Sequence, residues 1–320
     1  MLSSSSQKGI TDNQIIAAWR KCGGSSNRVA KALGISPQVV RQRRRRIEDM
    51  RGIALHTVDL SQRGEAVEQT LLKRRDLKLK NGTVVVFSDC HWWPGEPTVG
   101  DRALTALCRE LKPALVIGNG DLVDGASLCR QDPSGWEQVP TVAEELKVVR
   151  TRLDEIRRAS PKSEFYRTRG NHDTRFDRLL KMNAGAYEGV AGFALSDHLK
   201  DWPESWSIFI NGHTCVKHRF NNGVNATLAN TLRAGTNIVT GHLHRLQVTA
   251  WGDYNGRRYG VDTGTLADPH GQQFDYGEDN PTPHAQGFAV LTYLDGALLP
   301  PELCEVIKGV AYFRGAAVAA

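Results

Sequence analysis

Val84-Val85-Val86-Phe87-Ser88-Asp89-Cys90-His91 joins a strand signal to a chemical one. Four consecutive apolar residues, three of them β-branched, are typical of a strand buried on both faces. Asp89 and His91 follow this strand, and their spacing of two places them on one side of an extended chain, with Cys90 on the other. A buried strand that ends in an acid and an imidazole predicts an α/β fold with a polar site at the carboxyl edge of its sheet.

The same arrangement of strand, polar loop and helix recurs twice more. An apolar run at 114–117 precedes Gly120-Asp121-Leu122-Val123-Asp124, and a run at 165–168 precedes Gly170-Asn171-His172-Asp173. Helices are expected over 101–111 and 141–158. Parallel strands joined by helices bring their carboxyl ends to one edge of the sheet, so the three polar loops should meet there.

The second half of the chain supplies histidines. Residues 206–218 contain an Asn-Gly pair between two strand-like runs, which is a strong hairpin signal. His218 ends the returning strand. A further strand at 238–240 leads into Gly241-His242-Leu243-His244. Carboxylates, imidazoles and an amide oxygen suit divalent borderline metals, and no thiolate is needed. The five motifs therefore predict a site for two adjacent cations.

In this order, the motifs resemble those of the calcineurin-like metallophosphoesterase superfamily, from Asn81 to Phe313. The resemblance implies an α/β (α+β) four-layer sandwich of two mixed β-sheets flanked by helices. It also implies two divalent metal ions, with Mn²⁺ expected first and Fe, Zn, Ni or Mg as alternatives. The implied ligands are Asp89, His91 and His244 for one metal, Asn171, His218 and His242 for the other, and Asp121 as the bridge.

Two more residues take roles from this resemblance. His172 would stabilise the transition state or protonate the leaving oxygen, and Asp124 would orient His172 and favour its charged form. Two cations about 3.5–4 Å apart can clamp a phosphate and supply the nucleophile, so hydrolysis of a phosphate ester is implied. Arg219 follows His218 where the family usually has glycine, which leaves His213 as a competing ligand. His218 is favoured because it ends a strand, as other ligands do.

The first 80 residues differ in charge from the rest. They hold 17 Lys and Arg against 7 Asp and Glu, whereas the remaining 240 residues hold 24 against 28. The net charges are therefore +10 and −4, and the basic excess belongs to the N-terminal quarter. This asymmetry indicates a nucleic-acid-binding segment attached to a near-neutral body.

Three short helices are expected at the N-terminus. The first begins after Thr11, the second covers 28–33, and Ser36-Pro37 starts the third, with Gly34 permitting the turn between them. The pattern resembles a helix-turn-helix whose third helix enters the major groove of DNA. RNA or a protein is the alternative partner. The candidate contacts are Gln38, Arg41 and Gln42 to base edges, and Arg43, Arg44, Arg45 and Arg46 to phosphates.

We expect a helix-turn-helix domain at 1–50, a linker at 51–80 and a metallophosphoesterase domain at 81–320. The linker would lead into a hairpin over 77–86, because Asn-Gly stands between alternating apolar residues. No apolar segment of membrane-spanning length and no signal peptide are visible, and the six cysteines show no disulfide rhythm. A cytoplasmic protein without a membrane partner is expected, and a homo-oligomer stays open.

The combined features predict a metal-dependent phosphodiesterase that acts on DNA, a nuclease directed by its N-terminal domain. Two alternatives remain: a phosphomonoesterase or nucleotide phosphodiesterase that acts on small substrates, and a DNA-binding assembly protein with an inactive phosphoesterase body. The fusion of this N-terminal domain with this body is similar to phosphoesterases encoded by tailed bacteriophages, which would place the protein in the host cytoplasm.

Overall fold

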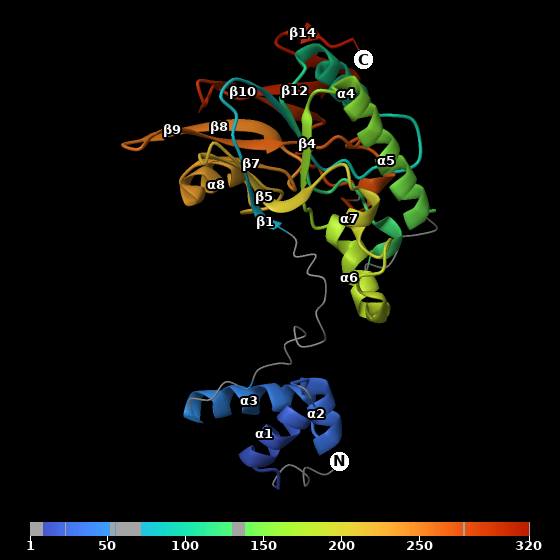
Figure 1. The fold of residues 1–320 in the computed structure, drawn as a ribbon, viewed down its shortest axis with the longest axis vertical. Coiled ribbons are helices and arrows are strands. Elements are labelled where there is room, and N and C mark those ends of the chain that lie inside the picture. The colour runs from blue at the N-terminus through green and yellow to red at the C-terminus, as the bar shows by residue number, and fades with distance from the viewer. Residues whose placement is uncertain are drawn as a thin grey trace. The chain divides into compact units, whose positions relative to one another are not determined.

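The structure is a computed structural model in which residues 9–22, 24–51, 55, 72–129, 138–277 and 279–319 are described. The chain divides into two compact units, residues 1–68 and 69–320 (Figure 1). Each unit has its own hydrophobic core. Within the described ranges, no helix combines the length and the apolar content that a membrane span requires.

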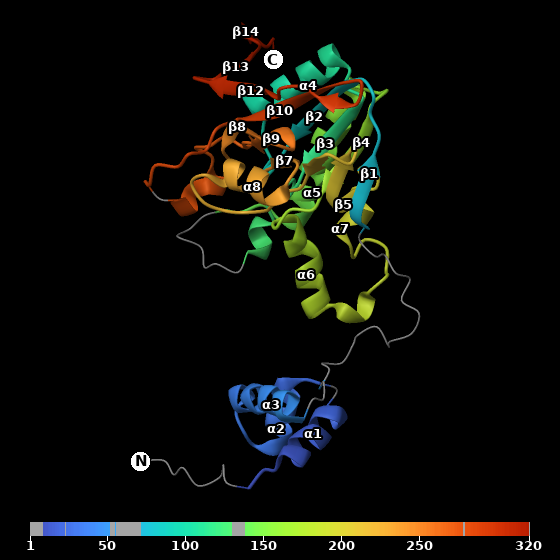
Figure 2. The same cartoon turned by 90° about the vertical axis from the view of Figure 1, so that its left-hand side faces the viewer.

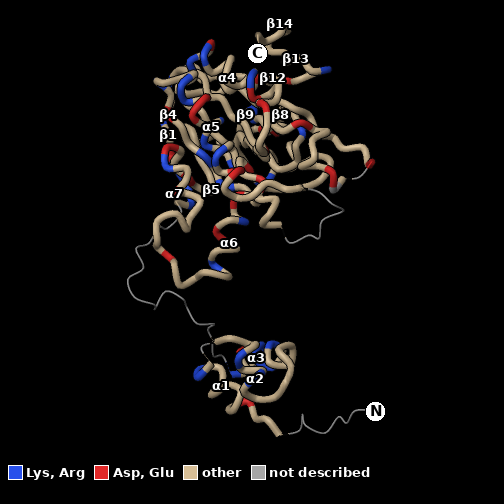
Figure 3. The backbone as a smooth tube through the Cα atoms, turned by 90° about the vertical axis from the view of Figure 1, so that its right-hand side faces the viewer, with Lys and Arg blue, Asp and Glu red and all other residues tan. Residues whose placement is uncertain are grey.

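The described part of the N-terminal unit forms the three helices that the sequence predicted. Thr11 starts the first helix with a capping box: its hydroxyl accepts the Gln14 N–H, and the Gln14 side chain accepts the Thr11 N–H. Gly34 ends the second at a φ of 66°, which lets the chain turn at once into the third. Figure 3 shows Lys and Arg gathered on that third helix. The helices are α1 (Asp12–Lys21), α2 (Ser26–Leu33) and α3 (Pro37–Arg51).

The larger unit is built on three parallel strands with helices between them. Val86, Ile117 and Tyr166 lie side by side in these strands. Helices on one face of the strands complete the first core. The predicted repeat of strand, polar loop and helix is confirmed. Its members are β2 (Gly82–Phe87), α4 (Val99–Leu111), β3 (Leu115–Asn119), α5 (Val142–Ala159) and β4 (Glu164–Thr168).

After β4, two helices lead to the remaining strands. The predicted hairpin over 206–218 is confirmed, because Phe209 pairs with Cys215 across an antiparallel turn. The elements are α6 (Asp173–Asn183), α7 (Leu195–His198), β5 (Glu204–Ile210), β6 (Thr214–Val216), α8 (Ala226–Ala234), β7 (Asn237–Thr240), β8 (Leu246–Asp253), β9 (Gly256–Thr263), β10 (Gly287–Leu294), β11 (Ala297–Leu298), β12 (Glu302–Ile307), β13 (Val310–Phe313) and β14 (Ala316–Ala317).

The predicted four layers are present, but the two sheets are joined. Backbone hydrogen bonds link the strands described in the body into one 14-stranded mixed sheet. The sheet curves so that β9 lies against β10, although β2 to β7 separate them along the hydrogen-bonded path. A second core of strand side chains, from β2, β3, β5, β6, β7, β9 and β10, fills the space between the facing halves. α4 and α5 cover one outer face, and α8 packs on β7, β8 and β9.

The predicted hairpin over 77–86 is wrong. The strand β1 (Leu72–Leu77) pairs in parallel with β5, and Leu77 lies opposite Ile210. β2 has no free edge for β1, because β3 and β10 already occupy both of its edges. The last part of the predicted linker therefore belongs to the sheet of the body. Residues 52–54 and 56–71 of that linker lie outside the described residues.

Candidate metal centre

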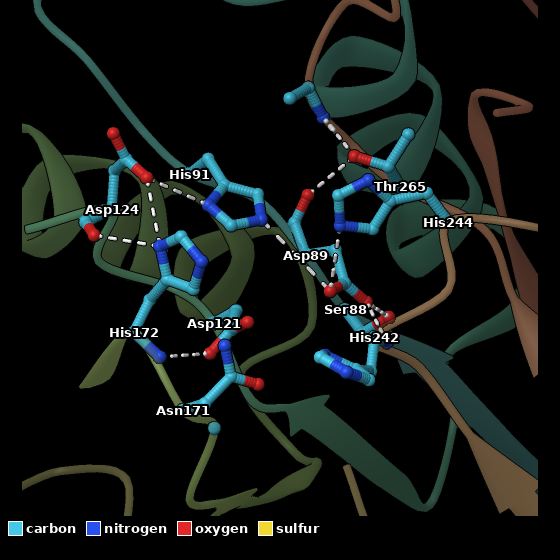
Figure 4. Close-up of polar contacts among 12 residues, drawn as sticks. Ser88, Asp89, His91, Asp121, Asp124, Asn171, His172, His242, His244 and Thr265 are labelled. Carbon is cyan, nitrogen blue, oxygen red and sulfur yellow. Dashed lines mark hydrogen bonds and ion pairs between the residues drawn. The ribbon is translucent and has the colours of Figure 1, made fainter. Parts of the chain in front are cut away.

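Side chains from the polar loops after β2, β3, β4 and β7 meet at one place (Figure 4), and His218, which follows β6, joins them there. Asp89, Asp121 and His218 are almost completely buried there, with 0%, 1% and 2% of their surface exposed. Acids and imidazoles so far from water require partners with opposite charge or metal ions. This convergence is the arrangement that the sequence predicted for the carboxyl edge of the sheet.

The first cluster contains Asp89, His91 and His244. His244 Nε2 lies 3.1 Å and His91 Nε2 4.0 Å from Asp89 Oδ1. The other carboxylate oxygen, Oδ2, accepts hydrogen bonds from Ser88 Oγ and from the His242 backbone N–H, which fixes the direction of Oδ1. His91 Nε2 is buried without a hydrogen-bond partner among the described residues, and Asp89 Oδ1 faces the ring nitrogens of His244 and His91. These buried oxygen and nitrogen atoms lie close together, and they are of the types that ligate a divalent cation.

The second cluster contains Asp121, His218 and His242. His218 Nε2 lies 3.0 Å from Asp121 Oδ2 and 3.1 Å from Asn171 Oδ1. The Nδ1–H of His218 donates to the carbonyl oxygen of Asn119 at 2.8 Å, so Nε2 is the nitrogen available to a metal. This donor set of carboxylate, amide and imidazole fits a second cation.

Asp121 connects the two clusters. Its carboxylate belongs to a group with His218 and His242 and also to a group with His91 and His172. His218 Nε2 also lies 4.0 Å from Asp89 Oδ1, so the clusters are adjacent. The competing candidate His213 is directed elsewhere, because its Nε2 lies 2.8 Å from the carbonyl oxygen of Gly296. The structure thus brings the seven predicted ligands together and leaves His213 outside.

Asp124 contacts two histidines. Its Oδ1 lies 3.0 Å from His172 Nδ1 and 3.1 Å from His91 Nδ1, and Trp93 Nε1 donates to its Oδ2 at 2.8 Å. The sequence predicted only the contact with His172. By fixing the ring of His91 as well, Asp124 also orients a predicted metal ligand.

Charges inside the site shift the pKa values of its groups. Burial alone would lower the pKa of His218, but the carboxylates of Asp121 and Asp89 outweigh it and raise the pKa to about 10. Burial likewise raises the pKa of Asp89, yet the facing His218 and His244 hold it at about 2. Burial and the neighbouring His218 lower the pKa of His242 to about 4. Without cations a proton on His218 stabilises the carboxylates, and cation binding would displace that proton.

The backbone at the ligands is strained, which the sequence analysis did not predict. Asp89, His91, Asp121, His242 and His244 have φ values of 52°, 41°, 52°, 75° and 56°. Residues other than glycine seldom adopt this left-handed region, and each instance costs roughly 1–3 kcal/mol. The sharp turns direct the side chains back over the strand ends, where the ligands meet.

At two glycines of the motifs, there is no room for a side chain, although the backbone conformation there does not itself require glycine. A Cβ at Gly170 would overlap the carboxylate and backbone nitrogen of Asp121. A Cβ at Gly241 would overlap the side chains of Ser88 and Asp89. These close approaches let the loops pack directly against the carboxylates of Asp121 and Asp89.

Asp173 holds the Asp121 loop, a role that was not predicted. Its buried carboxylate accepts the backbone N–H groups of Asp121, Leu122, Val123 and Gly170 at 2.9–3.2 Å. Four donors on one carboxylate fix the turn that presents Asp121. The only sequence signal was its place in the motif that also contains Asn171 and His172.

Glu145, on α5, holds the loop that follows Asp124. Its two carboxylate oxygens accept the backbone N–H groups of Gly125 and Ala126 at 2.7 and 3.0 Å. Burial, with a contribution from the charge of Asp124, raises the pKa of Glu145 to about 7. No pattern in the sequence predicted this, because an acid in the first turn of a helix is ordinarily exposed.

Glu145 should make stability depend on pH. Its folded pKa lies above the ordinary value of 4.5, so the fold favours the protonated acid, and the stabilisation is lost as pH rises from 4.5 through 7. For metal-free protein, the free energy of unfolding measured in urea should fall by up to about 3 kcal/mol over this range. Glu145→Gln should remove most of this pH dependence. An equal pH dependence in both proteins would contradict this assignment.

The predicted nucleic-acid contacts on α3 fall into two groups. Gln38, Arg41, Gln42 and Arg45 are exposed, and their spacing places them on one face of the helix. Arg43 and Arg46 instead form ion pairs with Asp12 of α1, at 2.6 and 2.9 Å. Arg44 pairs with Glu48 at 3.1 Å and lies over the ring of Trp19. Three of the predicted contacts therefore hold the unit together.

The sequence model of the family described as calcineurin-like phosphoesterase matches residues 82–263. No curated protein matches the chain. Among solved structures, Vps29 from Entamoeba histolytica, crystallised with Zn²⁺, is similar at 15% identity and a TM-score of 0.39, over 74% of this chain and 99% of its own. YfcE, a phosphoesterase from E. coli, is similar at 14% identity and a TM-score of 0.34, over 68% of this chain and 97% of its own.

Proposed function

Because the chain belongs to the calcineurin-like phosphoesterase family, we propose that it hydrolyses phosphodiester bonds of DNA with two divalent cations bound. The observation that carries this proposal is the pair of adjacent ligand clusters, with Asp121 of the second lying within ligand distance of His91 of the first. The choice of DNA is supported by the exposed face of α3, in a unit with a strong excess of basic residues.

Each residue of the site has a definable task. The first cluster would hold one cation, the second cluster with Asn171 would hold the other, and Asp121 would contact both. When bound, the cations act as Lewis acids on the phosphate and lower the pKa of the attacking water. His172 would donate a hydrogen bond to the phosphate or a proton to the leaving oxygen, because Asp124 fixes its Nδ1 and directs Nε2 away. Asp173 keeps Asp121 in position.

Comparing substrates tests this proposal. The wild-type protein should hydrolyse single- or double-stranded DNA and a chromogenic phosphodiester faster than a chromogenic monoester, with Mn²⁺ most effective among Mn²⁺, Mg²⁺, Zn²⁺, Ni²⁺ and Fe²⁺. A preference for the monoester would favour a phosphatase of small substrates. Binding of DNA without hydrolysis of any ester would favour a DNA-binding assembly protein. A cytoplasmic location is part of the proposal, and all six cysteines are free thiols.

The exposed face of α3 should carry DNA affinity. Arg41→Gln with Arg45→Gln should weaken binding of duplex DNA and lower the slope of log K against log salt by about 1 for each phosphate that is no longer neutralised. Binding would be measured by fluorescence anisotropy at several salt concentrations. The matched variant Arg43→Gln should instead lower the free energy of unfolding of the N-terminal unit, because it breaks the pair with Asp12. Unchanged DNA affinity of the double variant would reject this surface.

A further inference from the structure

Arg175, in the first turn of α6, lies against the proposed catalytic histidine. Its Nη2 is 3.2 Å from His172 Nε2, and its Nη1 donates to the carbonyl oxygen of Asp124 at 3.0 Å. The Cδ of Arg175 would lie 3.2 Å from a Cβ at Gly125, so the loop leaves little spare room beside the guanidinium. The guanidinium is therefore held at the site by specific contacts.

These contacts define the protonation of His172. Its Nδ1 faces two acceptors, the carbonyl and carboxylate oxygens of Asp124, so Nδ1 carries a hydrogen. Its Nε2 faces Arg175, which has only donors, so Nε2 accepts. The guanidinium thus occupies the nitrogen that His172 would use toward a substrate. A phosphate oxygen is an acceptor, so it would draw the guanidinium away from Nε2 and, once Nε2 has taken up a proton, accept a hydrogen bond from each group.

Further basic side chains continue from Arg175 along α6. Arg178 and Lys181 follow at intervals of three residues, so they are neighbours on the helix surface, and both are exposed. Within the described part of the chain, neither forms an ion pair. α6 starts at the metal centre and extends away from the sheet (Figure 2). Its rise of about 1.5 Å per residue spreads the three side chains over about 9 Å.

We propose that Arg175, Arg178 and Lys181, the α6 basic row, hold the backbone of the nucleic acid strand that is cleaved. Arg175 takes the phosphate at the metal centre, and Arg178 and Lys181 take phosphates further along the same strand. Along the axis of duplex DNA, where one strand advances about 3.4 Å per nucleotide, the row would span two or three nucleotides; along an extended single strand it would span fewer. This inference rests on the proposed function and adds a second DNA contact, located in the body and independent of α3. A polyanionic strand fits a row of three cations better than a single small phosphate does.

Comparing two substrates distinguishes the role of Arg175 from the roles of Arg178 and Lys181. Arg178→Gln with Lys181→Gln should raise the KM for a single-stranded oligonucleotide about tenfold or more and leave bis(p-nitrophenyl) phosphate unaffected. For this double variant, the slope of log K for the oligonucleotide against log salt concentration should fall by about 0.7 for each phosphate that is no longer neutralised. Arg175→Gln should raise the KM for both substrates, on the order of 10–100-fold, and Arg175→Lys should restore part of the loss. An equal effect of the double variant on both substrates would overturn the row.

A matched control removes the same charge elsewhere. Arg109 and Lys162 are exposed and lie shortly before β3 and β4, at the opposite end of these strands from the metal centre. Arg109→Gln with Lys162→Gln should leave both KM values unchanged. If this variant raised the oligonucleotide KM as much as Arg178→Gln with Lys181→Gln, the effect would be one of net charge and the α6 basic row would be rejected.

Chemical modification tests the row without relying on activity. Full-length protein in EDTA would be acetylated with and without the oligonucleotide, and the modified lysines would be quantified by mass spectrometry. Lys181 should be protected several-fold and Lys162 should not. Equal modification of both would overturn the proposal even if the enzyme cleaves DNA, whereas protection of Lys181 in a protein that cleaves nothing would reject the proposed function and retain the row.

Discussion

Asp121→Asn should abolish the phosphoesterase activity of this protein. Asparagine keeps the shape of the side chain and an oxygen that can accept the backbone N–H of His172, which now donates to Asp121 Oδ1 at 2.7 Å. It lacks the negative charge that two neighbouring cations require from a shared ligand. We expect kcat to fall by at least about 10²–10³-fold, the cost of removing one electrostatic interaction with a transition state, and more if the cations dissociate.

Metal analysis identifies the cause of this loss. Wild-type protein after dialysis against Mn²⁺ should retain two ions per chain and Asp121→Asn one or none. Asp201→Asn is the matched control, because Asp201 is exposed and pairs with Arg157 on the surface. It should keep both the ions and the activity. Two tightly held ions in Asp121→Asn, with activity within tenfold of the wild type, would show that Asp121 is not the shared ligand.

Local sequence signals were sufficient to predict the strands that carry the site. The run Val84–Phe87 and the apolar run before Asp121 each predict a buried strand with a polar residue at its end, and the partly buried run before Asn171 does the same with aromatic residues. Because the strands run parallel, their carboxyl ends lie at the same edge of the sheet, and this does not depend on how the other strands are arranged. For the same reason, the seven predicted ligands converge, although they are spread over residues 89–244.

Interactions between distant segments could not be predicted in this way. β1 pairs with β5, about 130 residues further along the chain, and its basic side chains resemble those of a linker. The guanidinium carbon of Arg74 lies 3.6 Å from the ring centre of Phe209 and that of Arg75 lies 5.0 Å from that of Tyr166, so the neighbouring strands provide aromatic rings for these cations. Pairing between remote strands depends on which edges other strands leave free, and no local pattern records this.

The supporting residues of the site escaped prediction for a related reason. Glu145 looks like an ordinary surface acid until the helix is placed against the loop that contains Gly125. The positive φ values of Asp89 and Asp121 arise because several loops must turn inward around one small volume. In each case the determining partner lies on a different element, and only packing brings it into contact.

Loss of His172 should slow the chemical step while leaving the metals in place. His172 lies within ligand distance of Asp121 and His91, so a role as a further metal ligand has to be distinguished from a catalytic role toward the phosphate or the leaving oxygen. We expect His172→Ala to retain two Mn²⁺ ions and to reduce kcat by about 10²–10⁴-fold. His270→Ala, at an exposed histidine, should change neither quantity.

The leaving group reports which role His172 has. A general acid assists most when the departing oxygen is strongly basic, as in DNA, and little when it departs as a stable phenolate. The defect of His172→Ala should therefore be large with DNA and much smaller with bis(p-nitrophenyl) phosphate. Equal defects with both substrates would exclude proton donation to the leaving oxygen and favour stabilisation of the phosphate instead. Loss of one bound ion would assign His172 to the metal ligands, because proton donation alone does not require it to hold a cation.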